Sequence, residues 1–240
     1  MQRIAEDPLR ILRFFRFFAR FGDLPDADAL DACTARANDL MALSRERIAA
    51  EVLKLLIAEH APGVVALMIE QGIFRPVLPE ITDAGRLDRL AGREAASGVE
   101  PNAIRRLAAL LPRDAAIAED VGARLRLSNI DRRRLIAATE PSGNEDALAL
   151  HYRLGETLAT DRLLLSDRPI EDAKALVGAT APSFPIKGGD LVARGIGKGP
   201  DVARLLRVVE GHWIAEGFPD AVRTAQIADA AVSQWLTSNR

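Results

Sequence analysis

The sequence has 240 residues, of which 48% are hydrophobic and 28% are charged, and its formal net charge at pH 7 is -2. This composition is ordinary for a globular protein and is sufficient for one large domain or two small ones. Because the chain has no general excess of basic residues, any contact with nucleic acid must come from a local basic patch.

Three further features limit the setting and the chemistry. The sequence contains no run of about 18 apolar residues, and its charged first residues lack the apolar core of a signal peptide, which argues against a membrane span and against secretion. The single cysteine, Cys33, excludes an internal disulfide and fits a cytoplasmic location. The three histidines lie far apart, without Cys or His partners at ligand spacing, so a zinc site is not expected.

Apolar residues recur at helical spacing along almost the whole chain. After the opening segment, the clearest i, i+3, i+4 stripes lie at 48–60, 103–111, 132–139 and 201–217. Alternating β-branched runs are nearly absent. The pattern therefore predicts an all-α protein without a sheet, an elongated array of helices of roughly 10–16 residues joined by short connections.

Glycines mark the predicted helix ends, and capping residues or prolines mark the starts. The predicted ends are Gly22, Gly72, Gly98, Gly122 and Gly217, and the predicted starts are Asp7-Pro8, Ser44, Pro101, Ser128-Asn129 and Pro219-Asp220. Residues 181–190, rich in Pro, Gly and Ser, are the strongest linker-like stretch. These breaks predict three parts, 1–60, 61–180 and 181–240, the last with a glycine-rich helix-turn-helix.

The opening helix has two unusual faces. Asp7 is suited to the N-cap and Pro8 to the first helical position. With a turn of about 100° per residue, the two faces consist of Arg13, Arg16 and Arg20 on one side and Phe14, Phe17, Phe18 and Phe21 on the other. We expect the phenylalanines to enter the core and the arginines to form a ridge suited to phosphates or bases. A core helix with a solvated basic face is the alternative.

The stretch EDPLRILRFFRFFARFG, residues 6–22, resembles the neck helix of class II tRNA nucleotidyltransferases, the family of CCA-adding enzymes and bacterial poly(A) polymerases. That family carries a Glu-Asp-x-x-Arg motif in this helix. SRERIAAEVLKLL, residues 44–56, resembles the next neck element, and residues 188–213 resemble the tail of a bacterial subgroup. The resemblance identifies the three predicted parts as neck, helical body and tail.

The resemblance implies that Asp7 and Arg10 read the base of the incoming nucleotide in place of a nucleic-acid template. A carboxylate accepts from the exocyclic amino group that cytosine and adenine share, and a guanidinium donates to a ring nitrogen or carbonyl. Arg13 is expected to support this nucleotide pocket. Without the resemblance, the first interpretation of Asp7 is a helix cap.

Four residues are expected to support the neck, namely Glu6, Arg16, Arg47 and Glu51. Glu6 complements the helix dipole, and Arg16 contacts phosphate or a neighbouring domain. Arg47 and Glu51, four residues apart, are expected to brace the neck through an ion pair. The alternative for this pair is a solvated bridge worth under about 1 kcal/mol.

Further basic residues are expected to contact the RNA backbone, with a solvated face or, around Lys198, a plain interhelix turn as the alternative. These residues are Arg20, Arg105, Arg106, Arg132, Arg133 and Lys198. Lys198 lies in GIGKGPD, which lacks the Gly-Lys-Ser/Thr ending of a phosphate-binding P-loop.

Nucleotidyl transfer requires metal ions held by carboxylates, and the family places them in an N-terminal head domain with Gly-Ser followed by Asp-x-Asp. The only Asp-x-Asp here is Asp26-Ala27-Asp28, which has no preceding Gly-Ser and no surrounding strand. We therefore expect no catalytic residue and no metal site in this chain. Mg²⁺ would be bound by a head domain that the chain lacks, and the chain alone would be inactive.

The resulting hypothesis is the C-terminal part of a CCA-adding tRNA nucleotidyltransferase, with tRNA, ATP, CTP and a head domain as partners. The sequence does not decide whether the chain forms a homodimer. The alternatives are the corresponding region of a poly(A) polymerase, a stand-alone helical RNA-binding protein, and a helical scaffold whose arginine ridge docks acidic proteins.

Overall fold

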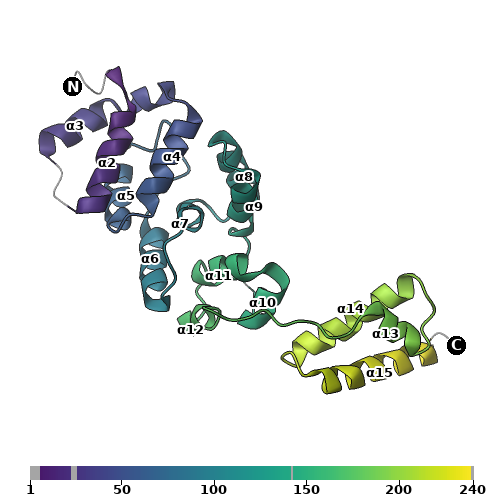
Figure 1. The fold of residues 1–240 in the computed structure, drawn as a ribbon. Helices are drawn as coiled ribbons and strands as arrows, with labels where there is room; N and C mark the ends of the chain where they lie inside the picture. Colours follow the sequence, from purple (N-terminus) through teal and green to yellow (C-terminus); the bar gives the residue numbers. More distant parts are fainter. Residues whose placement is uncertain (1–5, 23–25, 142, 239–240) are drawn as a thin grey trace. The chain divides into compact units, whose positions relative to one another are not determined.

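The structure is a computed structural model that describes residues 6–22, 26–141 and 143–238. These residues form helices and turns without a strand, which confirms the all-α prediction (Figure 1). In chain order, with η1 a 3-10 helix, the described helices are α2 (Leu9–Phe21), α3 (Ala27–Ala35), η1 (Ala37–Ala42), α4 (Arg45–Leu56), α5 (Ala61–Glu70), α6 (Gly85–Ser97), α7 (Ala103–Leu110), α8 (Ala115–Arg124), α9 (Asn129–Ala137), α10 (Ala147–Leu154), α11 (Glu156–Leu164), α12 (Ile170–Lys174), α13 (Gly188–Ala193), α14 (Pro200–Ala215) and α15 (Ala221–Ser238). Within the described ranges, no helix has both the length and the apolar character needed to cross a membrane.

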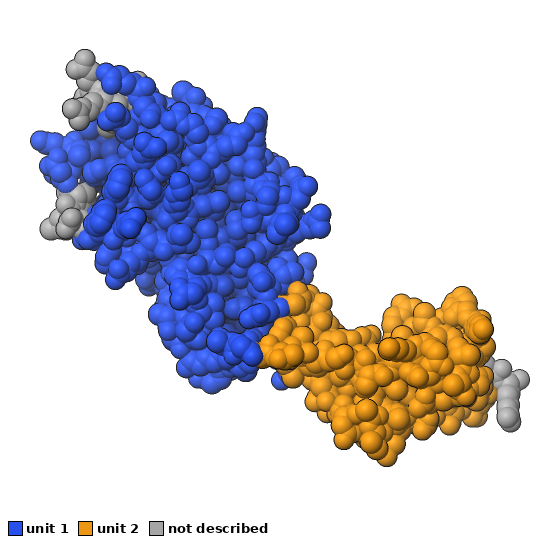
Figure 2. Space-filling view, viewed as in Figure 1, with its two compact units in different colours: residues 1–147, 156–178 blue, residues 148–155, 179–240 orange. Residues whose placement is uncertain are grey.

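The chain divides into two compact units (Figure 2). Unit 1 comprises residues 1–147 and 156–178, and unit 2 comprises residues 148–155 and 179–240. The chain therefore enters unit 2 twice. The division into parts at 60 and 180 stays a prediction about function, whereas the two units are defined by packing alone.

Most predicted helix ends follow local backbone chemistry. Gly22 and Gly98 are C-caps with φ +71°, a left-handed conformation that glycine adopts without steric cost. Gly122 is a wrong prediction, because it lies inside α8. A Cβ atom there would be 3.0 Å from Cγ of Arg132 on α9. Gly122 thus serves the close approach of α8 and α9 instead of ending a helix.

Helix α2 buries a different face from the one expected. Ile11, Phe15 and Ala19 are completely buried, whereas Phe17 and Phe21 are 52% and 62% exposed. These three residues lie four positions apart and pack toward α4 and α5. The prediction that the stripe containing Phe17 and Phe21 forms the core is therefore wrong, because the neighbouring helices cover the stripe around Phe15.

Unit 2 has its own aromatic centre. Trp213 is 2% exposed, and its indole N–H donates to the carbonyl of Pro219 over 2.9 Å. The ring of Tyr152 meets Trp213 edge-on with a centroid distance of 5.3 Å, and Phe218 does the same at 4.8 Å. These contacts fasten the segment 148–155 to residues that follow it by about sixty positions.

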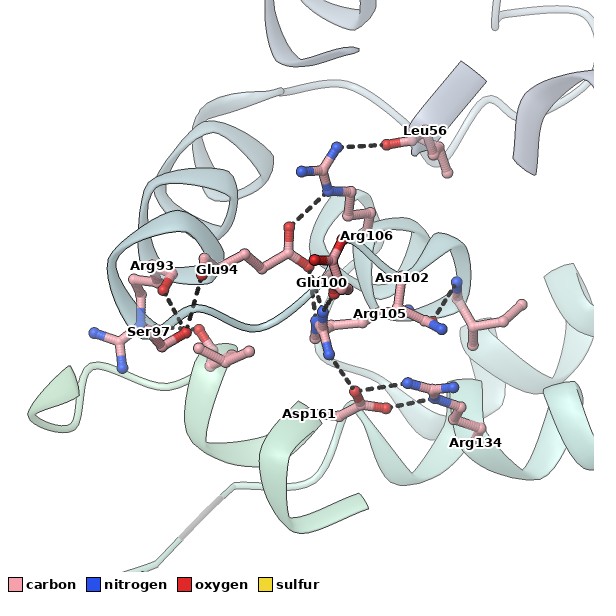
Figure 3. Close-up of polar contacts among 12 residues, drawn as sticks. Leu56, Arg93, Glu94, Ser97, Glu100, Asn102, Arg105, Arg106, Arg134 and Asp161 are labelled. Atoms are coloured by element: carbon pink, nitrogen blue, oxygen red, sulfur yellow. Dashed lines mark hydrogen bonds and ion pairs between the residues drawn. The ribbon is translucent and has the colours of Figure 1, made fainter. Parts of the chain in front are cut away.

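A network of buried charges joins α6, α7, α9 and α11 in unit 1 (Figure 3). The two carboxylate oxygens of Glu94 accept from Nε of Arg105 at 2.8 Å and from Nε of Arg106 at 2.7 Å. Asp161 accepts from Nη1 of Arg105 at 3.1 Å and takes a bidentate contact from Arg134 at 2.6 and 2.9 Å. Each carboxylate thus bridges two guanidinium groups.

Arg105 and Arg106 are consequently interior residues, with exposures of 2% and 5%. Nη1 of Arg106 donates to the carbonyls of Leu56 and Ala58 at the carboxyl end of α4. Because their guanidinium groups are enclosed and paired, the expectation that Arg105 and Arg106 contact RNA is wrong. Their role is to hold helices together.

We predict that Glu94→Gln lowers the free energy of unfolding by about 3–5 kcal/mol, because it leaves buried guanidinium charge without its carboxylate. Urea unfolding followed by circular dichroism measures the change. Glu140→Gln is the matched control, since Glu140 is 57% exposed in its pair with Arg162, and its effect should stay below about 1 kcal/mol. Equal effects of the two substitutions would contradict the importance of the network.

Candidate nucleotide and RNA interface

The arginine face of α2 rests on α4 through one buried carboxylate. The side chain of Glu51 is 6% exposed, and its two oxygens lie 3.6 Å from Nε of Arg13 and 2.8 Å from Nε of Arg16. The short contact to Arg16 is an ion pair without hydrogen-bond alignment, since neither Nε nor Oε2 has a hydrogen-bond partner among the described residues. Glu51 therefore fixes two predicted site residues at once.

Asp7 makes two contacts that the sequence suggested only in part. Its Oδ1 accepts from the backbone N–H of Leu9 at 3.2 Å. The prediction that Asp7 is the N-cap and Pro8 the first helical residue is wrong by one position, because Pro8 is the N-cap and α2 begins at Leu9. The same oxygen accepts from Nη2 of Arg47 at 3.1 Å, and Oδ2 lies 3.4 Å from that nitrogen. The side chains of Asp7 and Arg47 are 33% and 50% exposed, so a ligand can reach both.

The expected pair between Arg47 and Glu51 is replaced by three ion pairs between α4 and the region of α2. Arg47 reaches Asp7 at the start of α2, and Glu51 reaches Arg13 and Arg16 further along the same helix. The side chains cross the interface because α4 packs along α2. The two helices are thus braced at successive turns.

Arg10 and Arg20 lie at the surface of α2. Arg10 follows Asp7 by three positions and forms no ion pair in the described part of the chain. The guanidinium of Arg20 lies 5.7 Å from the ring centroid of Phe21, and that of Arg16 lies 4.9 Å from Phe17. Glu6 is exposed at the start of this region.

Phe17 and Phe21 are surface residues that sequence reasoning placed in the core. Their rings stack with a centroid distance of 6.3 Å and an interplanar angle of 8°. They share with Arg10 the positions i, i+7 and i+11 of α2, which lie on one line along a helix. This shared spacing with a charged residue was the signal in the sequence that Phe17 and Phe21 lie on the surface. The exposed side of α2 therefore carries both cationic and aromatic groups.

The other predicted RNA contacts have different surroundings. Arg132 on α9 is 32% exposed and pairs with Glu119 on α8. Arg133 is exposed on the same helix. Lys198 is exposed in the turn between α13 and α14 and belongs to unit 2, whereas the other candidates belong to unit 1. Arg133 and Lys198 stay accessible candidates, while Arg132 has a structural partner.

The carboxylates of the described residues do not form a metal cage. No group of three or more His, Cys, Asp or Glu side chains is placed to hold a metal ion there. Asp26 precedes α3 as its N-cap residue, and Asp28 lies in the first turn of that helix, both exposed. Two exposed carboxylates at a helix start do not provide the ligand set of an Mg²⁺ site.

Comparisons with known proteins agree on one kind of relative. Residues 25–84 match the family described as "Probable RNA and SrmB- binding site of polymerase A". The mitochondrial CCA tRNA nucleotidyltransferase 1 of Mus musculus is 27% identical over 238 residues, which cover 90% of this chain and 54% of that protein. The CCA-adding enzyme of Bordetella bronchiseptica is 35% identical over 140 residues, covering 56% and 38% of the two chains. This chain thus spans about half the length of the mouse protein.

The fold also matches solved structures. The Thermotoga maritima CCA-adding enzyme complexed with tRNA aligns with a TM-score of 0.71 at 14% identity, over 97% of this chain and 62% of that one. A CCA-adding enzyme complexed with CTP aligns with a TM-score of 0.70 at 14% identity, over 95% and 61% of the two chains. At such identities the likeness concerns the fold alone.

We predict that Glu51→Gln lowers the free energy of unfolding by about 1–3 kcal/mol, because Arg16 and Arg13 lose the charged acceptor that holds them to α4. Asp39→Asn is a matched control, because Asp39 pairs with Arg36 at 35% exposure of both side chains. Its cost should be below about 1 kcal/mol. Thermal unfolding of both variants decides the comparison, and a Glu51→Gln variant as stable as the control variant would refute the bracing role.

Proposed function

We propose that this chain selects the nucleotide and binds the RNA in a CCA-adding tRNA nucleotidyltransferase. The chain belongs to the class II family of CCA-adding enzymes and poly(A) polymerases and corresponds to the RNA-binding C-terminal region of that family. Its substrates would be CTP, ATP and the 3′ end of tRNA. A separate head domain would hold Mg²⁺ and carry out the transfer. With one buried cysteine and no disulfide, we propose a cytoplasmic location.

The observation that carries this proposal is the placement of Asp7 and Arg10. Both lie at the start of α2 with accessible side chains, and Arg47 holds the Asp7 carboxylate in a defined orientation. An oriented carboxylate beside a guanidinium presents an acceptor next to donors. Cytosine and adenine offer the complementary pattern, an amino donor beside a ring acceptor, whereas guanine and uracil present a carbonyl where the amino group would be.

The nucleic-acid side of the proposal is supported by the surface of α2 and by the relatives. Exposed Phe17 and Phe21 with Arg16 and Arg20 beside their rings combine stacking and cationic groups, which suits RNA. Relatives with this fold have been solved with tRNA, with CTP and with ATP. In this assignment Arg13 supports the nucleotide pocket, and Arg133 and Lys198 contact the RNA backbone.

A poly(A) polymerase is the second candidate, because the family matched by residues 25–84 is described from polymerase A. Use of CTP and of a tRNA acceptor separates the two. A stand-alone RNA-binding protein would bind tRNA without any associated transfer. A scaffold for acidic proteins would bind tRNA no better than another polyanion, and its binding would not depend on Arg10 or Arg13.

We predict that CTP and ATP perturb the amide resonances of Asp7 and Arg10 more strongly than GTP and UTP do, because only the first two bases match the pair. Titration of the isotopically labelled chain, followed by NMR, measures this. Asp7→Ala and Arg10→Ala should remove the difference between the two pairs of nucleotides. Arg36→Ala should keep it, because Arg36 is the N-cap residue of η1 and pairs with Asp39. Equal responses to all four nucleotides would refute base selection by this pair.

We also predict that the purified 240-residue chain does not incorporate CTP or ATP into tRNA lacking its 3′ end, since its described residues hold no carboxylate group fit for the metal ions that the transfer requires. Incorporation of radiolabelled nucleotide with Mg²⁺ present is the measurement. Any incorporation above that of a heat-denatured sample would show that the chain has a catalytic centre of its own.

A further inference from the structure

Unit 1 contains an arginine-lined pocket away from α2. The pocket has a volume of about 390 Å³ and lies between α6 and the turn that joins α11 to α12. Its charged lining residues are Arg86, Arg89, Arg93, Arg113 and Asp167. Four cationic side chains thus meet one carboxylate in a single concavity.

Three of these arginines are held in place by neutral acceptors. Arg86 donates to the carbonyl of Leu111 at 2.7 Å, and Arg113 donates to that of Leu165 at 2.7 Å. Arg93 uses Nε and Nη2 on carbonyls of Leu163, Leu164 and Arg168 at distances of 2.8–3.1 Å. Except for the carbonyl of Arg168, these carbonyls lie at the carboxyl ends of α7 and α11, where the helix dipoles are negative. The contacts orient the groups but leave their charge without a paired anion.

The charge balance favours an added anion. None of the four arginines forms an ion pair with a carboxylate within the ranges described. The pKa of the Arg86 guanidinium is lowered, first by burial and then by repulsion from Arg113 and Arg89, while Asp167 and Asp83 act in the opposite direction. Crowded cations that repel one another are stabilised when an anion enters between them.

Helix capping alone does not account for the cluster. Arg89 is exposed on α6, and its guanidinium makes no hydrogen bond or ion pair with any residue that the structure describes. It is therefore not needed to satisfy a helix end. Its neighbours Arg86 and Arg93 each retain N–H groups beyond those used on carbonyls, because a guanidinium has five.

We propose that this pocket binds a phosphate group through Arg86, Arg89, Arg93 and Arg113. Arginine presents a planar fork that matches two phosphate oxygens, and several such forks converge here. We assign this phosphate to the backbone of the bound RNA, and this assignment of its source rests on the proposed function. The pocket would then anchor RNA on the helical body, apart from the base-selecting end of α2.

The first arm of the test uses inorganic phosphate and the intact chain. Phosphate should raise the unfolding temperature more than chloride does at equal ionic strength. Arg89→Gln should weaken the apparent phosphate affinity roughly tenfold, because a charge-assisted contact is lost. Lys174→Gln is the matched control, since Lys174 is an exposed cation on α12 outside the pocket, and it should keep the affinity of the unchanged chain. Equal responses of the two variants would overturn the phosphate site.

The second arm uses tRNA and identifies the source of the phosphate. The salt dependence of tRNA binding should fall by about one phosphate contact in Arg89→Gln, a change of roughly 0.7–1 in the slope of log affinity against log salt. Lys174→Gln should leave the slope unchanged. A slope unaffected by Arg89→Gln, with phosphate binding lost, would overturn RNA as the source and leave a free phosphate compound. Failure of the unchanged chain to bind tRNA would refute the proposed function, and the first arm would still decide the pocket.

Discussion

The buried carboxylates of Glu94 and Asp161 carry the organisation of unit 1. They bring together α6, α7, α9 and α11, and Arg106 extends the same network to the carboxyl end of α4. Arg47 in the first turn of α4 and Glu51 in its middle hold α2. A series of polar contacts thus runs from the interior through α4 to Asp7. Such contacts require complete pairing, because a buried charge without a partner is costly.

Arginine is suited to this architecture in a way that lysine is not. Only four of the 32 basic residues are lysines. A guanidinium can bridge two carboxylates or a carboxylate and a carbonyl in fixed geometry, as Arg105 and Arg106 do. The same side chain on the surface of α2 lies beside aromatic rings. Basic residues in this chain thus serve packing, aromatic contacts and charge, and a cluster in the sequence does not reveal which.

Local rules account for the parts of the structure that the sequence predicted. Helix period, the Ser44 cap and the left-handed Gly22 and Gly98 depend on neighbouring residues alone. The burial of Arg105 depends on Asp161, which follows it by 56 positions, and no local pattern contains that information. The buried face of α2 was similarly undetermined, since two apolar stripes were available and α4 with α5 covers only one. The Asp7 to Arg10 spacing was readable, whereas the contact of Arg47 with Asp7, 40 positions apart, was not.

The aromatic cluster of unit 2 has a consequence for synthesis on the ribosome. Tyr152 on α10 emerges well before Trp213 and Phe218, against which its ring packs. Meanwhile α11 and α12 follow directly and can complete unit 1. During translation the ring of Tyr152 therefore stays without these two aromatic partners until Trp213 and Phe218 have been released. A nascent chain of this design has a vulnerable interval between the completion of its first unit and the arrival of its final helices.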